Sequence, residues 1–476
     1  MAETRSKRTK IVCTIGPASR APETLRAMIR AGLDVARINF SHGTPAERAR
    51  DFATVRRIAR EERALVAIMA DLQGPKLRIG QVDPEPLRLA AGDRVVLTVD
   101  AAKGEKGRVE FPHPETIAAL KAGDRLVVGD GELELVVREK RPNQLLCETA
   151  VGGDLYSHKG VSAPPGTPIG SALTAKDRED VDFALEQGAD FLALSFVRSG
   201  RDVLELRSLI ESRGGSAAIV AKIEKREALQ DFASILDASD AVMVARGDLG
   251  TEIPVEEVPF RQKEIIRECN AAGKPVITAT QMLQSMIDHP QPTRAEASDA
   301  ANAVLDGTDA VMLSGETAVG RYPVASVETL AKIAATVEEK MLPWVGRPNF
   351  AESRHREPIT DAISNATVTI ARELGARLIL TSTSSGYTAR QVARERPVQP
   401  IVAFTQSEAT LRQLALSWGV VPLPSPLFAH SDALLEGMTR TALSTGLATK
   451  GDLVVITGGL PRGGGGRTNF LKIERL

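Results

Sequence analysis

The sequence predicts an α/β protein: a (β/α)8 TIM barrel with an inserted small β-barrel domain and a C-terminal α/β domain. Eight short apolar runs alternate with helix-like segments, which indicates the barrel. A stretch of different texture separates the third run from the fourth, and the alternation resumes beyond residue 345. With 476 residues, the chain is long enough for two or three domains.

The barrel prediction depends on the runs and on what lies between them. The runs are rich in Val, Ile and Ala, and amphipathic segments such as 22–32 and 258–273, which end in Gly, lie between most of them. Strands that alternate with helices favour parallel βαβ units, and eight such units favour a closed barrel. The expected strands are 10–16, 35–40, 65–72, 191–196, 217–224, 241–248, 275–281 and 310–316.

The interruption after the third run has the texture of an antiparallel β domain. Apolar and polar residues alternate there, and Gly-Asp and Asp-Gly pairs break the alternation. The segment 162–170 is rich in proline and is expected to be a hinge back to the barrel, and 341–358 is typical of a linker. No short internal repeat is visible. We expect the barrel to comprise 1–73 and 169–344, the insert 74–168, and the C-terminal effector or regulatory domain 345–476.

The composition excludes several functional classes. The net charge is −1, so no overall field attracts nucleic acid or acidic membranes. The cysteines at 13, 147 and 269 are scattered, which fits neither a disulfide framework nor a zinc site. The N-terminal residues lack the apolar core of a secretory signal, and no run approaches the roughly 20 apolar residues that cross a bilayer. We expect a cytoplasmic protein.

Polar residues follow nearly every expected barrel strand at the same end. Chemistry in (β/α)8 enzymes lies at the C-terminal ends of the strands, because the interior is filled with apolar side chains. We therefore expect these residues to form one ring at one mouth of the barrel. They are Arg37, Asn39, Ser41, Asp71, Ser195, Lys222, Glu224, Arg246, Asp248, Thr280, Ser314 and Glu316.

Charges of both signs in this ring indicate phosphoryl transfer. Glu224 and Asp248 can supply oxygens to Mg²⁺ (or Mn²⁺), and Lys222 and Arg37 suit phosphate or carboxylate oxygens. Such cations neutralise the charge on a phosphoryl group in transfer. Taken alone, Lys222 and Glu224 could equally be a structural ion pair, and Asp248 a turn residue. No Walker-type phosphate loop occurs.

Seven segments, in order, resemble the pyruvate kinase family across essentially the whole chain. The resemblance implies a phosphotransferase that converts phosphoenolpyruvate and ADP into pyruvate and ATP, the last step of glycolysis, and a homotetramer. The segments are ARINFSHG (36–43), DLQGPKLR (71–78), KGV (159–161), AKIE (221–224), MVARGDLG (243–250), ATQML (279–283) and MLSGETAVG (312–320).

The resemblance also implies roles for individual residues. Arg37 and Lys222 would hold the phosphoryl group, with Lys222 stabilising the transition state. Glu224 and Asp248 would bind Mg²⁺. The backbone near Gly247 and Asp248, together with Thr280, would hold the substrate carboxylate, and Thr280 would lie near the path of the proton.

The insert and its ends are assigned by the same resemblance. Arg78 and Lys159 would contact the nucleotide phosphates, and the insert would act as a lid that excludes water.

The potassium requirement is a separate expectation. The family's K⁺ site is matched by Asn39, Ser41, Asp71 and the carbonyl of Leu72. Potassium-dependent members carry Glu at the position that Lys76 occupies here. A fixed ammonium could supply the charge that K⁺ supplies elsewhere, so our hypothesis is activity without K⁺.

A loop in the C-terminal domain is expected to bind an allosteric effector. Hydroxyl side chains and a glycine precede a helix there, and such a loop binds phosphate through backbone N–H groups. The simpler interpretation is an ordinary helix cap. Family members bind a phosphorylated effector at this place, and segment 458–469 could be a second wall. The loop residues are Thr381, Ser382, Thr383, Ser384, Ser385 and Gly386.

Two other functions remain open from the sequence. A Mg²⁺-dependent barrel lyase or aldolase acting on pyruvate enolates would use the same carboxylates and cations without a nucleotide. A metabolite sensor that has lost catalysis would need none of them intact.

Overall fold

The structure is a computed structural model of the chain. Its described residues include two small segments, 166–167 and 354–355, between longer ones. The longer described ranges are 7–75, 77–100, 107–129, 133–164, 170–340, 357–425, 431–459 and 468–476. The expected linker 341–358 and the segment 458–469 fall largely outside these residues, and residues 165, 168 and 169 of the expected hinge 162–170 also lie outside them.

Eight parallel strands close into a barrel in the order β1-β16-β15-β14-β13-β12-β3-β2. All eight predicted runs are confirmed as strands. The sixth was predicted to run to residue 248 and the eighth to residue 316, and both ends are wrong, because the chain turns into a helix at Arg246 and at Gly315. The strands are β1 (Lys10–Ile15), β2 (Val35–Asn39), β3 (Ala67–Asp71), β12 (Phe191–Leu194), β13 (Ala218–Ile223), β14 (Ala241–Ala245), β15 (Val276–Ala279) and β16 (Ala310–Leu313).

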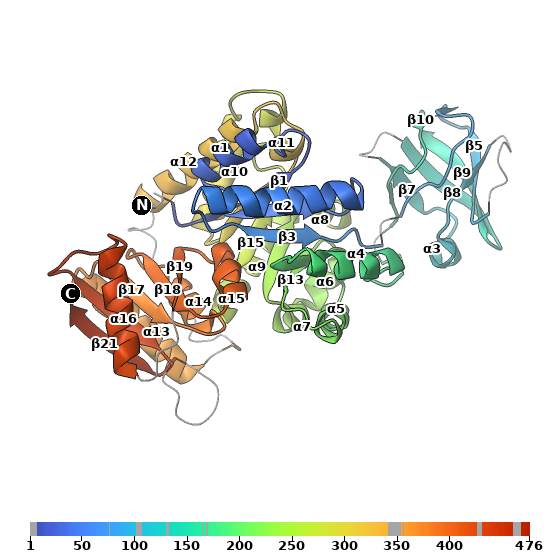
Figure 1. Ribbon diagram of the computed structural model, residues 1–476. Helices are drawn as coiled ribbons and strands as arrows, with labels where there is room; N and C mark the ends of the chain where they lie inside the picture. The colour runs from blue at the N-terminus through green and yellow to red at the C-terminus, as the bar shows by residue number, and fades with distance from the viewer. Residues whose placement is uncertain are drawn as a thin grey trace.

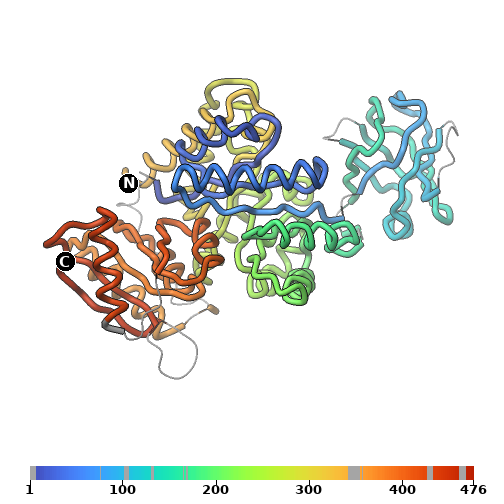
Figure 2. Tube along the Cα trace, in the orientation of Figure 1, coloured from blue at the N-terminus to red at the C-terminus, as the bar shows by residue number. Residues whose placement is uncertain are grey.

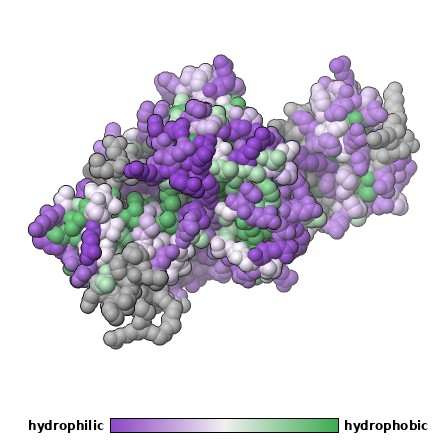
Figure 3. Space-filling model, in the orientation of Figure 1, coloured by the Kyte–Doolittle hydropathy of each residue, from purple (hydrophilic) through white to green (hydrophobic). Residues whose placement is uncertain are grey.

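Helices surround the barrel, as Figure 1 shows. The face in Figure 3 is largely hydrophilic over α2, whose opposite side buries Phe52, Val55 and Ile58. The helices are α1 (Pro22–Ala31), α2 (Pro45–Glu61), α4 (Ala175–Glu186), α5 (Gly200–Ser212), α6 (Arg226–Gln230), α7 (Phe232–Ala238), α8 (Arg246–Glu252), η1 (Val255–Glu257), α9 (Val258–Ala272), η2 (Gln284–Ile287), α10 (Arg294–Leu305), α11 (Gly315–Ala318) and α12 (Pro323–Lys340).

The insert follows β3 and is a β domain with its own apolar core. Figure 2 shows it projecting from the barrel, joined by the chain that leaves β3 and returns to α4. Its six-stranded sheet has the order β11-β7-β8-β9-β5-β6, and β10 pairs with β4. The elements are β4 (Leu87–Leu89), β5 (Arg94–Thr98), β6 (Arg108–Glu110), α3 (Pro114–Ala119), β7 (Arg125–Val128), β8 (Leu133–Arg141), β9 (Gln144–Val151), β10 (Gly153–Leu155) and β11 (Val161–Ser162).

The C-terminal domain is an α/β layer with the strand order β19-β18-β17-β20-β21, in which only the β20–β21 pair is antiparallel. The elements are α13 (Pro358–Glu373), β17 (Leu378–Ser382), α14 (Tyr387–Ala393), β18 (Ile401–Thr405), α15 (Glu408–Gln413), η3 (Leu414–Leu416), β19 (Val420–Pro424), α16 (Ser431–Ser444), β20 (Leu453–Gly458) and β21 (Phe470–Arg475).

The fold class is therefore confirmed, whereas the exact domain boundaries stay predictions. One cluster of buried side chains fills the barrel interior, and another fills the space between the strands and the helices. The interior cluster includes Ala415 and Leu416 of η3, so the C-terminal domain contributes to the base of the barrel. In the part of the chain that the structure describes, no helix has both the length and the apolarity to cross a bilayer.

Candidate active site

The ammonium of Lys222 is the centre of the polar ring. Its Nζ lies 3.2 Å from Oδ1 of Asp71 and 2.8 Å from Oε1 of Glu224. It also donates a hydrogen bond of 2.7 Å to Oγ of Ser195. These side chains come from the ends of the neighbouring strands β3, β12 and β13. The structure thus brings together residues that are up to 153 positions apart in the chain.

Arg37 joins this centre from β2. Its Nε lies 2.6 Å from Oδ2 of Asp71, and its Nη1 donates to Oγ1 of Thr14 on β1 at 2.8 Å. Asp71 therefore holds both cations of the site, one on each carboxylate oxygen. Because the carboxylate is only 2% exposed, it also fixes the distance between those cations firmly.

The electrostatics of the centre follow from burial and pairing. Burial alone would raise the pKa of Asp71, but Arg37 and Lys222 outweigh it and lower that pKa. Burial would lower the pKa of Lys222, but the carboxylates of Asp71 and Glu224 raise it above its ordinary value. Lys222 is therefore held as a cation in a buried position, where its charge is screened least.

Glu224 and Asp248 form a pair of like charges beside the cations. Burial raises the pKa of Glu224, and the nearby Asp248 raises it further, against the opposing effect of Lys222. Oε2 of Glu224 also accepts a 2.6 Å hydrogen bond from the N–H of Phe196. Among the described residues, no group of three or more His, Cys, Asp or Glu side chains has the arrangement of a metal site.

Thr280 and the start of α8 form a second wall. The N–H of Gly247 donates to Oγ1 of Thr280 at 2.8 Å. Thr280 and Gln281 have φ angles of 68° and 54°, a left-handed conformation that non-glycine residues rarely adopt. Arg246 holds this turn, because its Nη2 donates to the carbonyl of Thr280 at 2.7 Å while its Nη1 lies 2.7 Å from Asp299. Strain of this kind is typical of functional sites.

The last strand supports this wall from below. Glu316 is fully buried and accepts hydrogen bonds from the N–H groups of Leu283 and Ser314, at 3.0 and 2.7 Å. The Glu316 carboxylate therefore holds the backbone of Ser314 and Leu283 in place beside the turn at Thr280.

The four residues of the expected K⁺ site lie together at the ends of β2 and β3. Asn39 is the register partner of Asp71, and Oδ1 of Asn39 accepts from the N–H of Ser41 at 3.0 Å. The carbonyl of Leu72 accepts a 2.7 Å hydrogen bond from Ser195. Lys76 lies outside the described residues.

The two residues expected to bind nucleotide lie beside each other where the insert begins and ends. Arg78 forms a β-bridge with Gly160, and the carbonyl of Lys159 accepts from the N–H of Ile79 at 2.9 Å. The guanidinium of Arg78 donates to the carbonyl of His158 at 2.9 Å.

The expected effector loop joins β17 to α14. Thr381 is buried within β17, whereas Ser384 and Ser385 are exposed. The carbonyl of Ser384 accepts a 2.8 Å hydrogen bond from Thr410. Gly386 begins the helix with φ of 79°, in the left-handed region that glycine tolerates. The loop therefore presents only part of its hydroxyl groups to solvent.

Sequence reasoning missed two residues of the site. Thr14 contacts Arg37, and a polar residue near the end of the first apolar run is the same signal that identified the other members of the ring. Phe196 contributes only its backbone N–H to Glu224, with φ of 55°. No side-chain pattern could have indicated that contact.

The fold and this mouth define a class: a barrel enzyme that handles anionic substrates, with an inserted β domain and an α/β domain attached. Comparisons with known proteins identify the member of the class. The family model described as pyruvate kinase, barrel domain, matches residues 6–327, and the one described as pyruvate kinase, alpha/beta domain, matches 361–474. Together these two matches cover most of the chain.

Relatives of nearly full length agree. Pyruvate kinase of Geobacillus stearothermophilus is 43% identical over 98% of this chain and 80% of its own length. Pyruvate kinase of Agrobacterium vitis is 43% identical over 99% of this chain and 97% of its own. The crystal structure of a pyruvate kinase from Cryptosporidium parvum superposes with a TM-score of 0.90 at 36% identity, covering 99% of this chain and 96% of that one.

The chain belongs to the pyruvate kinase family, and it is a phosphotransferase by that membership. The resemblance stated from the sequence is confirmed. The alternative of a lyase or aldolase finds no support in these matches.

The lowered pKa of Asp71 predicts how its contribution to stability varies with pH. Asp71→Asn should lower Tm at pH 7, since breaking a buried pair costs about 3 kcal/mol or more. Because the native pKa is lowered, this contribution is complete above the ordinary pKa of about 4 and is lost as pH falls through the native value. The Tm difference between wild type and variant should therefore be constant from about pH 5 to 8 and shrink below about pH 4.

Calorimetry across this pH range measures the effect. Asp182→Asn is the control, because Asp182 pairs with Arg213 in an exposed position where an ion pair contributes little. An equal Tm difference for Asp71→Asn at pH 3 and pH 7 would contradict the assignment.

Proposed function

We propose that the protein catalyses Mg²⁺-dependent transfer of the phosphoryl group of phosphoenolpyruvate to ADP, giving pyruvate and ATP. The observation that carries this proposal is the buried Lys222 ammonium, held between Asp71 and Glu224 and beside Arg37. By membership of the family, we further propose that it works in glycolysis, in the cytoplasm, as a homotetramer.

The two cations bind and stabilise the phosphoryl group. Arg37 presents a guanidinium whose orientation is fixed by Asp71 and Thr14, and Lys222 remains protonated because of its two carboxylates. Charge that spreads over the phosphoryl oxygens during transfer is neutralised by groups already in place, which costs no reorganisation. The ammonium of Lys222 now donates to Ser195 and the carboxylates. When substrate binds, its oxygens would accept some of these hydrogen bonds instead.

The wall at Thr280 holds the other end of the substrate. The backbone N–H groups of Gly247 and Asp248 open helix α8, and with Thr280 they bind the substrate carboxylate. After transfer, Thr280 lies near the path of the proton to the enolate carbon, through water. Protonation of the enolate makes the overall reaction favourable.

The carboxylates of Glu224 and Asp248 would hold Mg²⁺. The donor set fits the ion, which usually takes one or two protein carboxylates and completes its shell with substrate oxygens and water. The raised pKa of Glu224 beside Asp248 also fits, because a divalent cation would relieve the repulsion between them. When bound, the ion would supply positive charge at the phosphoryl oxygens. The insert, with Arg78 and Lys159 on the nucleotide phosphates, would close as a lid and exclude water.

The first test is ATP formation from phosphoenolpyruvate and ADP. The wild type should be active with Mg²⁺ and inactive after chelation. Lys222→Met should lower kcat by about 100-fold to 1,000-fold, because a buried charge aimed at the transition state is lost. Lys263→Met is the control, since that lysine is exposed and pairs with Asp306 on the outer helices, away from the mouth of the barrel. Wild-type protein without activity, or Lys222→Met with full activity, would refute the proposal.

We also propose activity without K⁺, through Lys76. Rates in a buffer free of potassium and sodium should stay within about two-fold of those with 100 mM KCl. A difference of that size is what screening of exposed charges by salt would produce. Lys76→Glu should create a dependence on K⁺, because the ammonium is replaced by a carboxylate that needs a cation. A fall of orders of magnitude in the wild type without K⁺ would show that Lys76 does not replace the ion.

We further propose that the loop 381–386 binds a phosphorylated activator, a sugar phosphate or a nucleotide. The activator should lower the half-saturation concentration for phosphoenolpyruvate by about five-fold or more, the usual range of allosteric coupling. Ser384→Asp should abolish this response by placing a negative charge among the phosphate-binding groups, whereas Ser444→Asp on the exposed end of α16 should not. A panel of phosphorylated metabolites without any effect on the wild type would exclude the site.

A further inference from the structure

Four aspartates occupy equivalent places at the N-terminal ends of the barrel strands. They directly precede alternate strands of the barrel, one aspartate before each. Every aspartate forms two hydrogen bonds with a single residue of the preceding strand. Its N–H donates to the carbonyl of that residue, and its carboxylate accepts from the N–H of the same residue. We call these pairs the aspartate clamps: Asp34 with Ile11, Asp190 with Ile68, Asp240 with Ile219, and Asp309 with Val276.

The clamps are closely similar in geometry. The carboxylate oxygens lie 2.8, 2.7, 2.7 and 3.1 Å from the four N–H groups, in chain order. The clamped strand pairs are β1–β2, β3–β12, β13–β14 and β15–β16, which are neighbours in the barrel. Four neighbouring strand pairs are therefore each locked at the base by one carboxylate, and the insert lies between the two strands of the β3–β12 pair.

The cations that pair with the four carboxylates separate the clamps into two kinds. Asp34 is paired with Lys7 and Asp240 with Arg207, both in the barrel part of the chain and both on the same Oδ2 that accepts the strand N–H. Asp190 and Asp309 instead bind arginines of the C-terminal domain. Arg412 of α15 lies 2.6 Å from Asp190, and Arg396 lies 3.1 Å from Asp309.

The contact at Asp309 is held under strain. Arg396 has φ of 51°, and its guanidinium lies 4.9 Å from the ring of Trp418. The backbone N–H of Trp418 donates to Oδ1 of Asp309 at 3.3 Å. A non-glycine residue in this conformation costs of order 1 kcal/mol or more, so the surrounding contacts must compensate for it.

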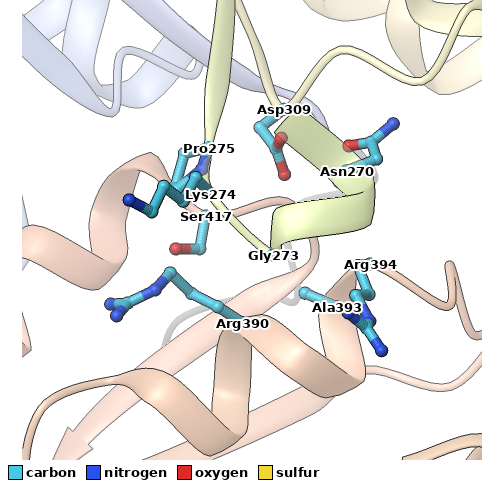
Figure 4. A pocket seen from close by; sticks show the side chains of 9 residues that line it. All are labelled: Asn270, Gly273, Lys274, Pro275, Asp309, Arg390, Ala393, Arg394 and Ser417. Carbon is cyan, nitrogen blue, oxygen red and sulfur yellow. The ribbon is translucent and has the colours of Figure 1, made fainter. Parts of the chain in front are cut away.

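The space beside this contact holds a water-sized gap, and its charged groups are already engaged. Figure 4 shows the end of α9 facing α14, with the residues that line the space between them. This cavity has a volume of about 10 Å³, room for a single water molecule. Lys274 donates to three carbonyls near the end of α7, and Arg394 pairs with Asp361. The gap therefore lies within the contact between the domains, which other hydrogen bonds also hold, such as that from Nη1 of Arg394 to the carbonyl of Ala271.

Both docked clamps belong to strands that end in the active site. Ile68 lies three residues before Asp71 on β3, and Val276 lies four residues before Thr280. At about 3.3 Å per residue, the carboxylates of Asp190 and Asp309 act roughly 10–13 Å below the two groups that organise the site. The strands between are buried and close-packed, so a displacement at the base moves the end of the same strand.

We propose that Asp190 and Asp309 are positioning residues, through which the seating of the C-terminal domain sets the places of Asp71 and Thr280. The inference rests on the proposed function for its kinetic readout. It gives the C-terminal domain a direct mechanical connection to substrate binding, separate from any effector.

The chain offers a matched pair of variants on a single carboxylate. Arg412 binds Asp190 from the C-terminal domain, and Arg56 binds it from α2 of the barrel at 2.8 Å. Either variant leaves Asp190 with one arginine and the N–H of Ile68, so the buried carboxylate stays compensated and the fold is retained. Arg412→Met should raise the half-saturation concentration for phosphoenolpyruvate about five-fold or more, with kcat changed less than about two-fold.

Arg56→Met should lower Tm to a similar extent but leave half-saturation within about two-fold. Arg412→Lys should restore most of the loss, and Arg396→Met should repeat the effect of Arg412→Met at the second clamp. Equal changes in half-saturation for Arg412→Met and Arg56→Met, or none in either, would show that Asp190 only supports the fold.

Hydrogen exchange separates this inference from the proposed function. If the wild type formed no ATP, the proposed function would fail. Hydrogen exchange in residues 69–75 of the same full-length variants would still test whether the clamp at Asp190 positions the end of β3. Faster exchange there in Arg412→Met than in Arg56→Met supports the positioning role. Equal exchange in the two variants overturns it.

Discussion

The ion pairs of Lys222 with Asp71 and Glu224 are the interaction on which the rest of this structure depends. Three charges buried at the mouth of an apolar barrel are tolerated only if each finds its partner, because an isolated buried charge would shift its pKa and neutralise. The partners come from separate strands, so they meet only in one register of β3, β12 and β13. The same register that fills the interior with side chains therefore assembles the site.

The base of the barrel follows the same logic with different partners. At the mouth, carboxylates hold cations that face a substrate. At the base, the aspartate clamps hold backbone N–H groups, which would otherwise be buried without a partner. Where the C-terminal domain docks, arginines complete the remaining oxygens of Asp190 and Asp309. One residue type thus closes both ends of a strand such as β3, with Asp190 below and Asp71 above.

The sequence was sufficient for the fold class and for most members of the ring, Thr14 excepted, and it was insufficient for contacts that depend on backbone geometry. Apolar runs identify buried strands because burial selects side chains directly, so Lys222 and Glu224 stood out against their neighbours. The N–H of Phe196 and the left-handed turn at Thr280 leave no such mark. The clamps were missed for another reason. A single Asp before a strand is unremarkable, and the repeat emerges only when each is seen bonded to the strand beside it.

Leu416 makes the barrel and the C-terminal domain depend on each other. Its side chain is fully buried and belongs to the cluster inside the barrel, so the C-terminal domain provides part of the barrel's own floor. A barrel separated from that domain would present an open apolar ring at its base, a surface that favours association with other chains. Recombination that exchanged the C-terminal domain without the barrel would also have to replace the buried contact that Leu416 makes at the base of the barrel. The two parts are therefore expected to travel together through evolution as a single inherited unit, whatever variation the projecting insert accumulates.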